Sequence, residues 1–164
     1  MRQLLLLASL LLVHGTDALS QRPDNLCTFD TCKSGTRAVT NFKTSDSYYS
    51  CPNRELATYV NTLIVIVSTQ VFLGAQPNIS NRTGEPAFEG ETKAAVDSLR
   101  AKAHVHTFDQ AVNSCTLGID KRRVTVTNAP SPSSAERFAS VVYVNDEVSK
   151  KAYWMPIFHL SKLK

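Results

Sequence analysis

Residues 51–74 read CPNRELATYVNTLIVIVSTQVFLG and hold the strongest structural pattern in this chain. Asn53 or Ser50 can cap a helix here, Pro52 suits an early helical position and Gly74 supplies a stop. The β-branched centre of the segment would suit a buried strand, but about twenty residues without internal Pro or Gly favour a helix. We therefore predict a central helix that ends near Leu73. Its apolar residues recur at spacings of three and four, which places them on one face: Leu56, Tyr59, Val60, Leu63, Ile64, Val67 and Val71.

Two shorter helices are predicted after a surface loop at residues 75–90. The first runs from Glu91 to about Ala103. The second follows Thr107-Phe108-Asp109-Gln110, which has the form of a capping box, and Gly118 closes it. The residues expected to point inward from the first of these helices are Ala95, Val96, Leu99 and Ala103. The acidic residues in and beside the loop are interpreted as solvated surface groups: Glu85, Glu89 and Glu91.

After Gly118 the pattern changes from helical to alternating. Val124 and Val126 alternate with polar residues, and strands are predicted at residues 138–144 and 152–158, the latter interrupted at Pro156. A turn is predicted at Asn145-Asp146, and a further short strand at residues 37–42. Helices that precede strands without alternation indicate an α+β fold. The prediction is a central amphipathic helix with two shorter helices, followed by a small C-terminal antiparallel β-sheet and stabilised by disulfides.

The tail Tyr153-Trp154-Met155-Pro156-Ile157-Phe158-His159-Leu160 locally resembles the closing segment of SH3-like barrels. There, an apolar pair and a proline precede a short turn and a last strand. The resemblance covers eight residues and departs from the pattern after the proline, where small and polar residues are usual. It implies a compact β end of the chain and no function.

The N-terminus has the form of a secretory signal peptide. Met1-Arg2-Gln3 gives a cationic start, residues 4–13 are apolar, and Ala18 and Ser20 are small residues that suit cleavage. The apolar run covers only half of the roughly 20 residues that a helix needs to cross a bilayer. We expect cleavage after Ser20, with Ala18 as the alternative, and no stable membrane insertion afterwards. The predicted organisation is a signal peptide at 1–20, a polar lead-in pinned by a disulfide at 21–50 and an α+β domain at 51–164, with 21–164 as one folded unit.

All four cysteines follow the predicted signal peptide: Cys27, Cys32, Cys51 and Cys115. An even number in an exported chain indicates two disulfides. Cys27 could pair with Cys32 and leave Cys51 to join Cys115, but a bond from Cys27 or Cys32 to Cys115 is also open. Zinc binding by these cysteines is less favoured, because no second pair follows at matching spacing.

The sharpest candidate for chemistry is His104-Val105-His106, with Asp109 close behind. On an extended segment, residues at spacing two face the same way, and two imidazoles with a carboxylate can bind zinc or copper. The alternative is a connection between helices, in which histidines often lie near helix ends. No catalytic residue is predicted, because the chain has neither a Gly-x-Ser-x-Gly elbow nor a phosphate-binding glycine loop.

Aromatic residues gather near the C-terminus: Tyr143, Tyr153, Trp154 and Phe158. Tyr and Trp serve both as half-buried core edges, the favoured role here, and as interface anchors. If the C-terminal strand is an edge, it could accept a strand of a partner.

Two further surface properties bear on partners. Asn78-Ile79-Ser80 and Asn81-Arg82-Thr83 would accept N-linked glycans if the source is eukaryotic. The net charge of +4 is modest and scattered, which argues against nucleic-acid binding.

These patterns leave two functions open. The preferred one is an exported, disulfide-stabilised, non-catalytic module of the periplasm or extracellular space, which binds a protein or an envelope component through its sheet end and needs no cofactor. The alternative is a small metal-binding protein or metal-dependent enzyme that uses His104, His106 and Asp109 with zinc or copper.

Overall fold

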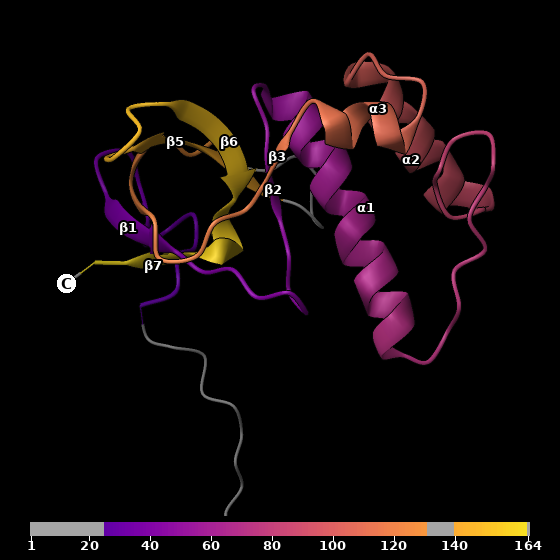
Figure 1. Cartoon of the computed structure of the whole chain (residues 1–164), viewed down its shortest axis with the longest axis horizontal. Coiled ribbons are helices and arrows are strands. Elements are labelled where there is room, and N and C mark those ends of the chain that lie inside the picture. The colour runs from indigo at the N-terminus through magenta and orange to yellow at the C-terminus, as the bar shows by residue number, and fades with distance from the viewer. Residues whose placement is uncertain (1–24, 131–139, 164) are drawn as a thin grey trace, which may run out of the picture.

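A computed structural model describes residues 25–130 and 140–163, so the predicted signal peptide, residues 1–20, lies outside the described residues. Figure 1 shows α1 between the sheet on one side and α2 and α3 on the other, and α1 contacts both. The elements in chain order are β1 (Arg37–Thr40), β2 (Tyr49–Ser50), α1 (Arg54–Phe72), α2 (Gly90–Lys102), α3 (Phe108–Asn113), β3 (Thr116–Leu117), β4 (Arg123–Asn128), β5 (Val141–Asp146), β6 (Ala152–Pro156), the 3-10 turn η2 (Ile157–His159) and β7 (Leu160–Lys162).

The fold is α+β, with three described helices, antiparallel sheets and two disulfides. The predicted order of helices followed by a sheet is only partly right, because β1 and β2 precede the helices. β1 is an inner strand of a five-stranded sheet with the order β6-β5-β4-β1-β7, and β2 pairs with β3 in a separate ribbon. Residues 37–40 are thus part of the main sheet.

The ends of α1 follow from its sequence. The side chain of Asn53 caps the helix by accepting a hydrogen bond of 2.9 Å from the backbone N–H of Leu56. Gly74 follows the helix with a φ of +79°, a backbone conformation that favours glycine. The predicted start and stop are confirmed, and the residues from Leu56 to Leu63 are buried.

The two shorter helices differ from their predictions in detail. Val96 and Leu99 of α2 are buried, but Ala95, expected to point inward, is exposed. Thr107 caps α3 by accepting a hydrogen bond of 3.1 Å from the Gln110 N–H. The Gln110 side chain accepts in turn from the N–H of His106, one residue before the cap, so the capping box is only half formed. α3 ends at Asn113, several residues before Gly118.

Two apolar clusters form the core. β5 alternates between them, because successive side chains of a strand face opposite sides: Val142 and Val144 join the first cluster and Val141 the second. The buried residues of the first are Cys27, Cys32, Ala38, Tyr48, Val124, Val126, Val142, Val144, Met155, Ile157 and Leu160. Those of the second are Cys51, Leu56, Ala57, Tyr59, Val60, Leu63, Val96, Leu99, Ala103, Ala111 and Val141.

The closing segment has the form that the local resemblance to SH3-like barrels implies. β6 ends at Pro156, the turn η2 follows, and β7 is the last strand. The turn before β6 lies later than predicted, because β5 continues through Asp146. The Asp146 carboxylate then holds the turn by accepting hydrogen bonds of 2.7 and 2.9 Å from the N–H groups of Val148 and Ser149.

Both outer edges of the five-stranded sheet are paired with short segments. At β6, Cys51 and Trp154 exchange two backbone hydrogen bonds of 2.9 and 2.8 Å. At β7, the N–H of Cys27 donates to the carbonyl of Leu160 at 2.8 Å. Each edge is therefore covered by a segment that carries a disulfide cysteine.

Gly118 has no room for a side chain. A Cβ atom there would lie 2.5 Å from the ring of Tyr48, which is 1% exposed and donates a hydrogen bond of 3.2 Å to the Ile119 carbonyl. We expect Gly118→Ala to lower the free energy of unfolding by about 3 kcal/mol, as overpacking does. Urea denaturation of the purified protein measures this loss.

Gly74→Ala is the control for that variant. Gly74 has a positive φ but no described atom near its absent Cβ, so alanine there costs only about 1 kcal/mol of backbone strain. Equal losses at the two glycines would contradict the steric argument.

Candidate functional site

The predicted metal ligands do not come together. His104 lies in the turn after α2 with a φ of 54°, so the segment is not extended and the spacing of two does not align its histidines. The side chains of His104, His106 and Asp109 are all exposed. Within residues 25–130 and 140–163 there is no group of three His, Cys, Asp or Glu side chains that could hold a metal ion. The predicted zinc or copper site is therefore not formed, and the segment connects α2 to α3.

The cysteines form the first of the pairings considered in the sequence analysis. Cys27 bonds to Cys32 and Cys51 bonds to Cys115, which leaves none of the four free. The second bond joins residues 64 positions apart and ties the start of α1 to the end of α3. Two disulfides are typical of oxidising extracellular compartments.

The four C-terminal aromatic residues do not share one surface. Tyr143 and Trp154 are cross-strand partners on β5 and β6, with ring centroids 5.2 Å apart. Tyr153 faces the opposite side and packs against the first core cluster, where burial raises the pKa of its phenol. Phe158 lies in η2 and is 44% exposed.

Asn78 and Asn81 are exposed on the loop between α1 and α2. Thr83, which completes the second tripeptide, is 7% exposed. Exposure of both asparagines is compatible with glycan attachment, which stays a prediction for a eukaryotic source.

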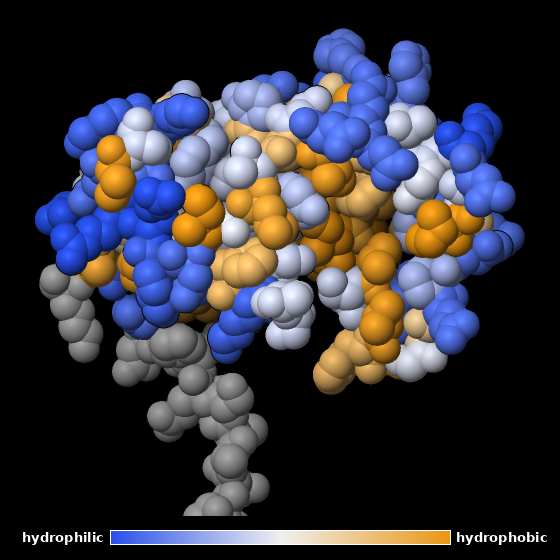
Figure 2. Space-filling model, viewed as in Figure 1, coloured by the Kyte–Doolittle hydropathy of each residue, from blue (hydrophilic) through white to orange (hydrophobic). Residues whose placement is uncertain are grey.

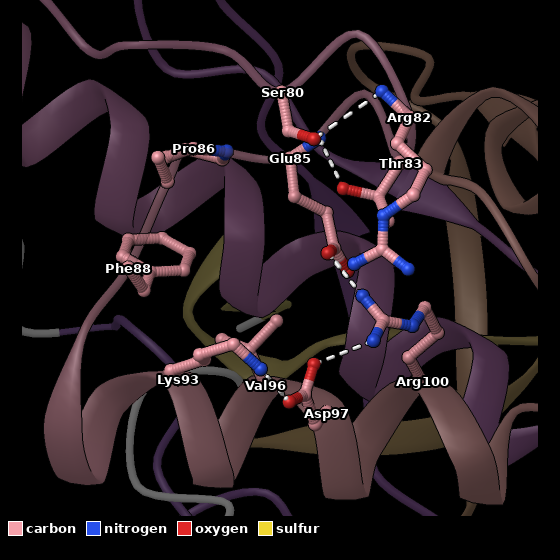
Figure 3. Close-up of a pocket in the computed structure, with 11 residues that line it drawn as sticks. Ser80, Arg82, Thr83, Glu85, Pro86, Phe88, Lys93, Val96, Asp97 and Arg100 are labelled. Atoms are coloured by element: carbon pink, nitrogen blue, oxygen red, sulfur yellow. Dashed lines mark hydrogen bonds and ion pairs between the residues drawn. The ribbon is translucent and has the colours of Figure 1, made fainter.

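Glu85 is the centre of a polar cluster that the sequence did not reveal (Figure 3). Interpreted above as a solvated group, it is only 5% exposed. Its carboxylate accepts a hydrogen bond of 2.5 Å from the Tyr59 hydroxyl of α1 and forms an ion pair with Arg100 of α2. Arg100 also pairs with Asp97, which in turn pairs with Lys93. The cluster fastens the loop to both helices.

The electrostatics of this cluster match a structural role. Burial, and after it the hydrogen bond to Glu85, raises the pKa of the Tyr59 phenol well above its usual value. Burial acts to lower the pKa of Arg100, but the charges of Glu85 and Asp97 outweigh it and raise that pKa. A hydrogen bond from Lys93 lowers the pKa of the Asp97 carboxyl. These groups bond to one another, so the cluster is a clamp.

The C-terminal half of α1 projects from the molecule, and the apolar side chains at its end are exposed. We define the distal half of α1 as residues 64–72 together with the C-cap residue Leu73; Figure 2 shows apolar surface at this projecting end. Val71 is 57%, Phe72 88% and Leu73 75% exposed. By length and composition α1 is the one described helix that could cross a membrane, but its N-terminal half is buried within the protein. A helix that is apolar all round is normally buried throughout.

A groove of about 740 Å³ lies beside the distal half of α1. α1, the end of the loop and the first turns of α2 enclose it. This arrangement explains why Ala95 is exposed: it faces the groove instead of a covering element. Apolar side chains in its wall include Val65, Ile66, Phe88, Ala95, Val96 and Leu99, and Glu89 and Glu91 stand exposed at the start of α2.

Two polar atoms in the groove wall are buried without a hydrogen-bond partner among the described residues. They are Oγ1 of Thr62, whose residue is 3% exposed, and Oε1 of Gln70. A buried polar group left unpaired costs about 1–3 kcal/mol.

No protein-family model matches this chain. No curated protein and no solved structure matches it either.

Proposed function

We propose that this protein is an exported, disulfide-stabilised, non-catalytic module that binds a partner protein through the distal half of α1. The observation that carries the proposal is the exposure of Val71, Phe72 and Leu73 at the end of a helix with no charged residue between Glu55 and Arg82. Contiguous exposed apolar surface of this kind marks interaction sites. The two disulfides and the predicted signal peptide support export.

The distal half of α1 is a better binding surface than the sheet end. The edges at β6 and β7 are already paired with the segments of Cys51 and Cys27. Tyr143 and Tyr153 lie on opposite faces of the sheet, so the aromatic residues offer no single patch.

Site-specific crosslinking tests the binding surface. We expect a photoreactive amino acid at Phe72 to give discrete crosslinked proteins in the cells that produce this chain. Val148 is the matched control, because it is also apolar and 68% exposed but lies in the turn between β5 and β6. Equal products from positions 72 and 148 would contradict the proposal, and products from Phe158 alone would move the surface to the sheet end.

Intact mass of the protein isolated without reductant tests export. The expected mass lacks residues 1–20 and rises on reduction by the hydrogens of two disulfides. A chain that retains residues 1–20 and carries four free thiols would contradict the exported state.

A further inference from the structure

We propose that the groove between α1 and α2 binds an amphipathic helix of the partner protein, with Lys or Arg residues beside its apolar face. This inference rests on the proposed function and adds the chemistry of the partner. The distal half of α1 forms one wall of the groove, so a helix bound there also covers Val65 and Ile66. Laying an apolar helix face into an apolar groove is a recurrent mode of peptide recognition.

The loop-side wall of the groove is held in place before any partner binds. Ala87 and Phe88 belong to the loop that Glu85 clamps to α1 and α2. The loop also closes on itself, because the N–H of Ala87 donates to the Asn78 carbonyl at 2.7 Å. A preformed groove loses little conformational entropy on binding, which favours affinity.

The polar groups of the groove select a cationic occupant. Glu89 and Glu91 line the groove, are both exposed and place two carboxylates near the start of α2. None of the described residues that line the groove is Lys, Arg or His. These acceptors call for donors on the occupant, and Lys and Arg supply donors together with the complementary charge.

The same acidic groups disfavour the two other apolar occupants. A second copy of this chain would offer its own distal α1, which brings no positive charge between Glu55 and Arg82. Glu89 and Glu91 would be repelled by an anionic lipid surface, and a zwitterionic one offers them no net positive charge. A cationic helix satisfies both the apolar wall and the carboxylates.

Titration with designed peptides tests the inference on the purified, disulfide-intact protein. The probe is a fluorescein-labelled amphipathic helical peptide of Leu and Lys, measured by fluorescence anisotropy. One control peptide has the same composition in an order that destroys the apolar face, and another has Glu in place of Lys. We expect the amphipathic Leu/Lys peptide to bind at least about tenfold more tightly than either. Since the protein carries a net charge of +4, general attraction does not favour this peptide.

Matched variants locate the binding. Ala94 and Ala95 are both exposed on α2, but only Ala95 lines the groove. We expect Ala95→Arg to abolish binding of the Leu/Lys peptide and Ala94→Arg, which adds the same charge, to preserve it. Glu89→Gln/Glu91→Gln is expected to weaken binding about tenfold. Equal binding of all three peptides, or equal effects of the two arginine variants, would overturn the inference.

Two further measurements address the other occupants. Binding to vesicles of phosphatidylcholine and phosphatidylglycerol, lost in Phe72→Ser and unaccompanied by peptide binding, would overturn the inference in favour of a lipid surface. A dimer in light scattering that Ala95→Arg dissociates, without peptide binding, would overturn it in favour of a second copy. If position 72 crosslinks to a protein but the Leu/Lys peptide does not bind, the inference fails and the proposed function stands. If position 72 gives no crosslinked protein and the Leu/Lys peptide does not bind, the inference and the proposed function both fail.

Discussion

A Cys51→Ala/Cys115→Ala variant is expected to lose about 4 kcal/mol of unfolding free energy, because the disulfide closes a loop across 64 positions of the chain and so restricts the unfolded state. The bond also joins the segment on the β6 edge to the end of α3. A domain of ordinary stability has an unfolding free energy of only about 5–15 kcal/mol, so this variant should lose a large share of its stability and unfold at a clearly lower urea concentration. Urea denaturation at constant pH measures the loss.

Cys27→Ala/Cys32→Ala is the internal comparison. These cysteines are 5 positions apart, and the same entropy argument gives about 2 kcal/mol for so short a loop. Cys27, Cys32 and Cys51 are buried and Cys115 is half-buried, so loss of sulfur packing does not by itself make the longer loop the costlier one to open. A larger loss from the short loop would contradict the entropic account.

A Glu85→Ala variant is expected to lose about 3–5 kcal/mol of unfolding free energy, the range observed when one partner of a buried ion pair is removed. The substitution leaves Arg100, whose side chain is 18% exposed, without its buried partner. It also removes the acceptor of the Tyr59 hydroxyl, which is buried. Thermal and urea unfolding measure the change, and binding of the Leu/Lys peptide should weaken with it as the groove wall loosens.

Lys93→Ala is the control for this cluster. Lys93 pairs with Asp97 in an exposed pair within α2, and such surface pairs contribute little. Glu85→Gln should fall between the two variants, because an amide oxygen can still accept from Tyr59 but carries no charge. If Lys93→Ala lowers the unfolding free energy as much as Glu85→Ala does, burial of the ion pair between Glu85 and Arg100 is unimportant for stability.

Local patterns predicted the elements whose signals lie within a few residues. The start of α1 is set by Asn53, which bonds a backbone group three residues away, and its stop by Gly74. Val124 and Val126 likewise face the core as their alternation in β4 predicts. The place of β1 could not be predicted this way, since its partners include Thr125 and Lys162, far along the chain. No local pattern encodes such pairing.

The candidate site was missed for a similar reason. An acidic residue among glycines and prolines favours a solvated loop, and nothing near Glu85 in sequence reveals that Tyr59 and Arg100 meet it. The prediction of a metal site at His104 and His106 was wrong for the opposite reason. Their spacing would align the two side chains only on an extended segment, but the backbone turns at His104. One signal for the site did exist, because residues 63–67 are apolar on every side of the helix. This signal predicted that the middle of the helix is buried. It could not predict the groove, because that depends on which neighbouring elements cover the helix.

The pairing at the outer strands of the sheet has a consequence for the fate of the chain in a reducing environment. Asn25 and Cys27 cover β7, and Cys51 covers β6, through backbone hydrogen bonds. Strands with free backbone groups recruit strands from other molecules and start aggregates. Cys51 is crosslinked to Cys115 beyond the end of α3, so we expect reduction to loosen the segment that covers β6. We therefore expect the reduced protein to aggregate more readily than the oxidised one, as light scattering with and without reductant would measure.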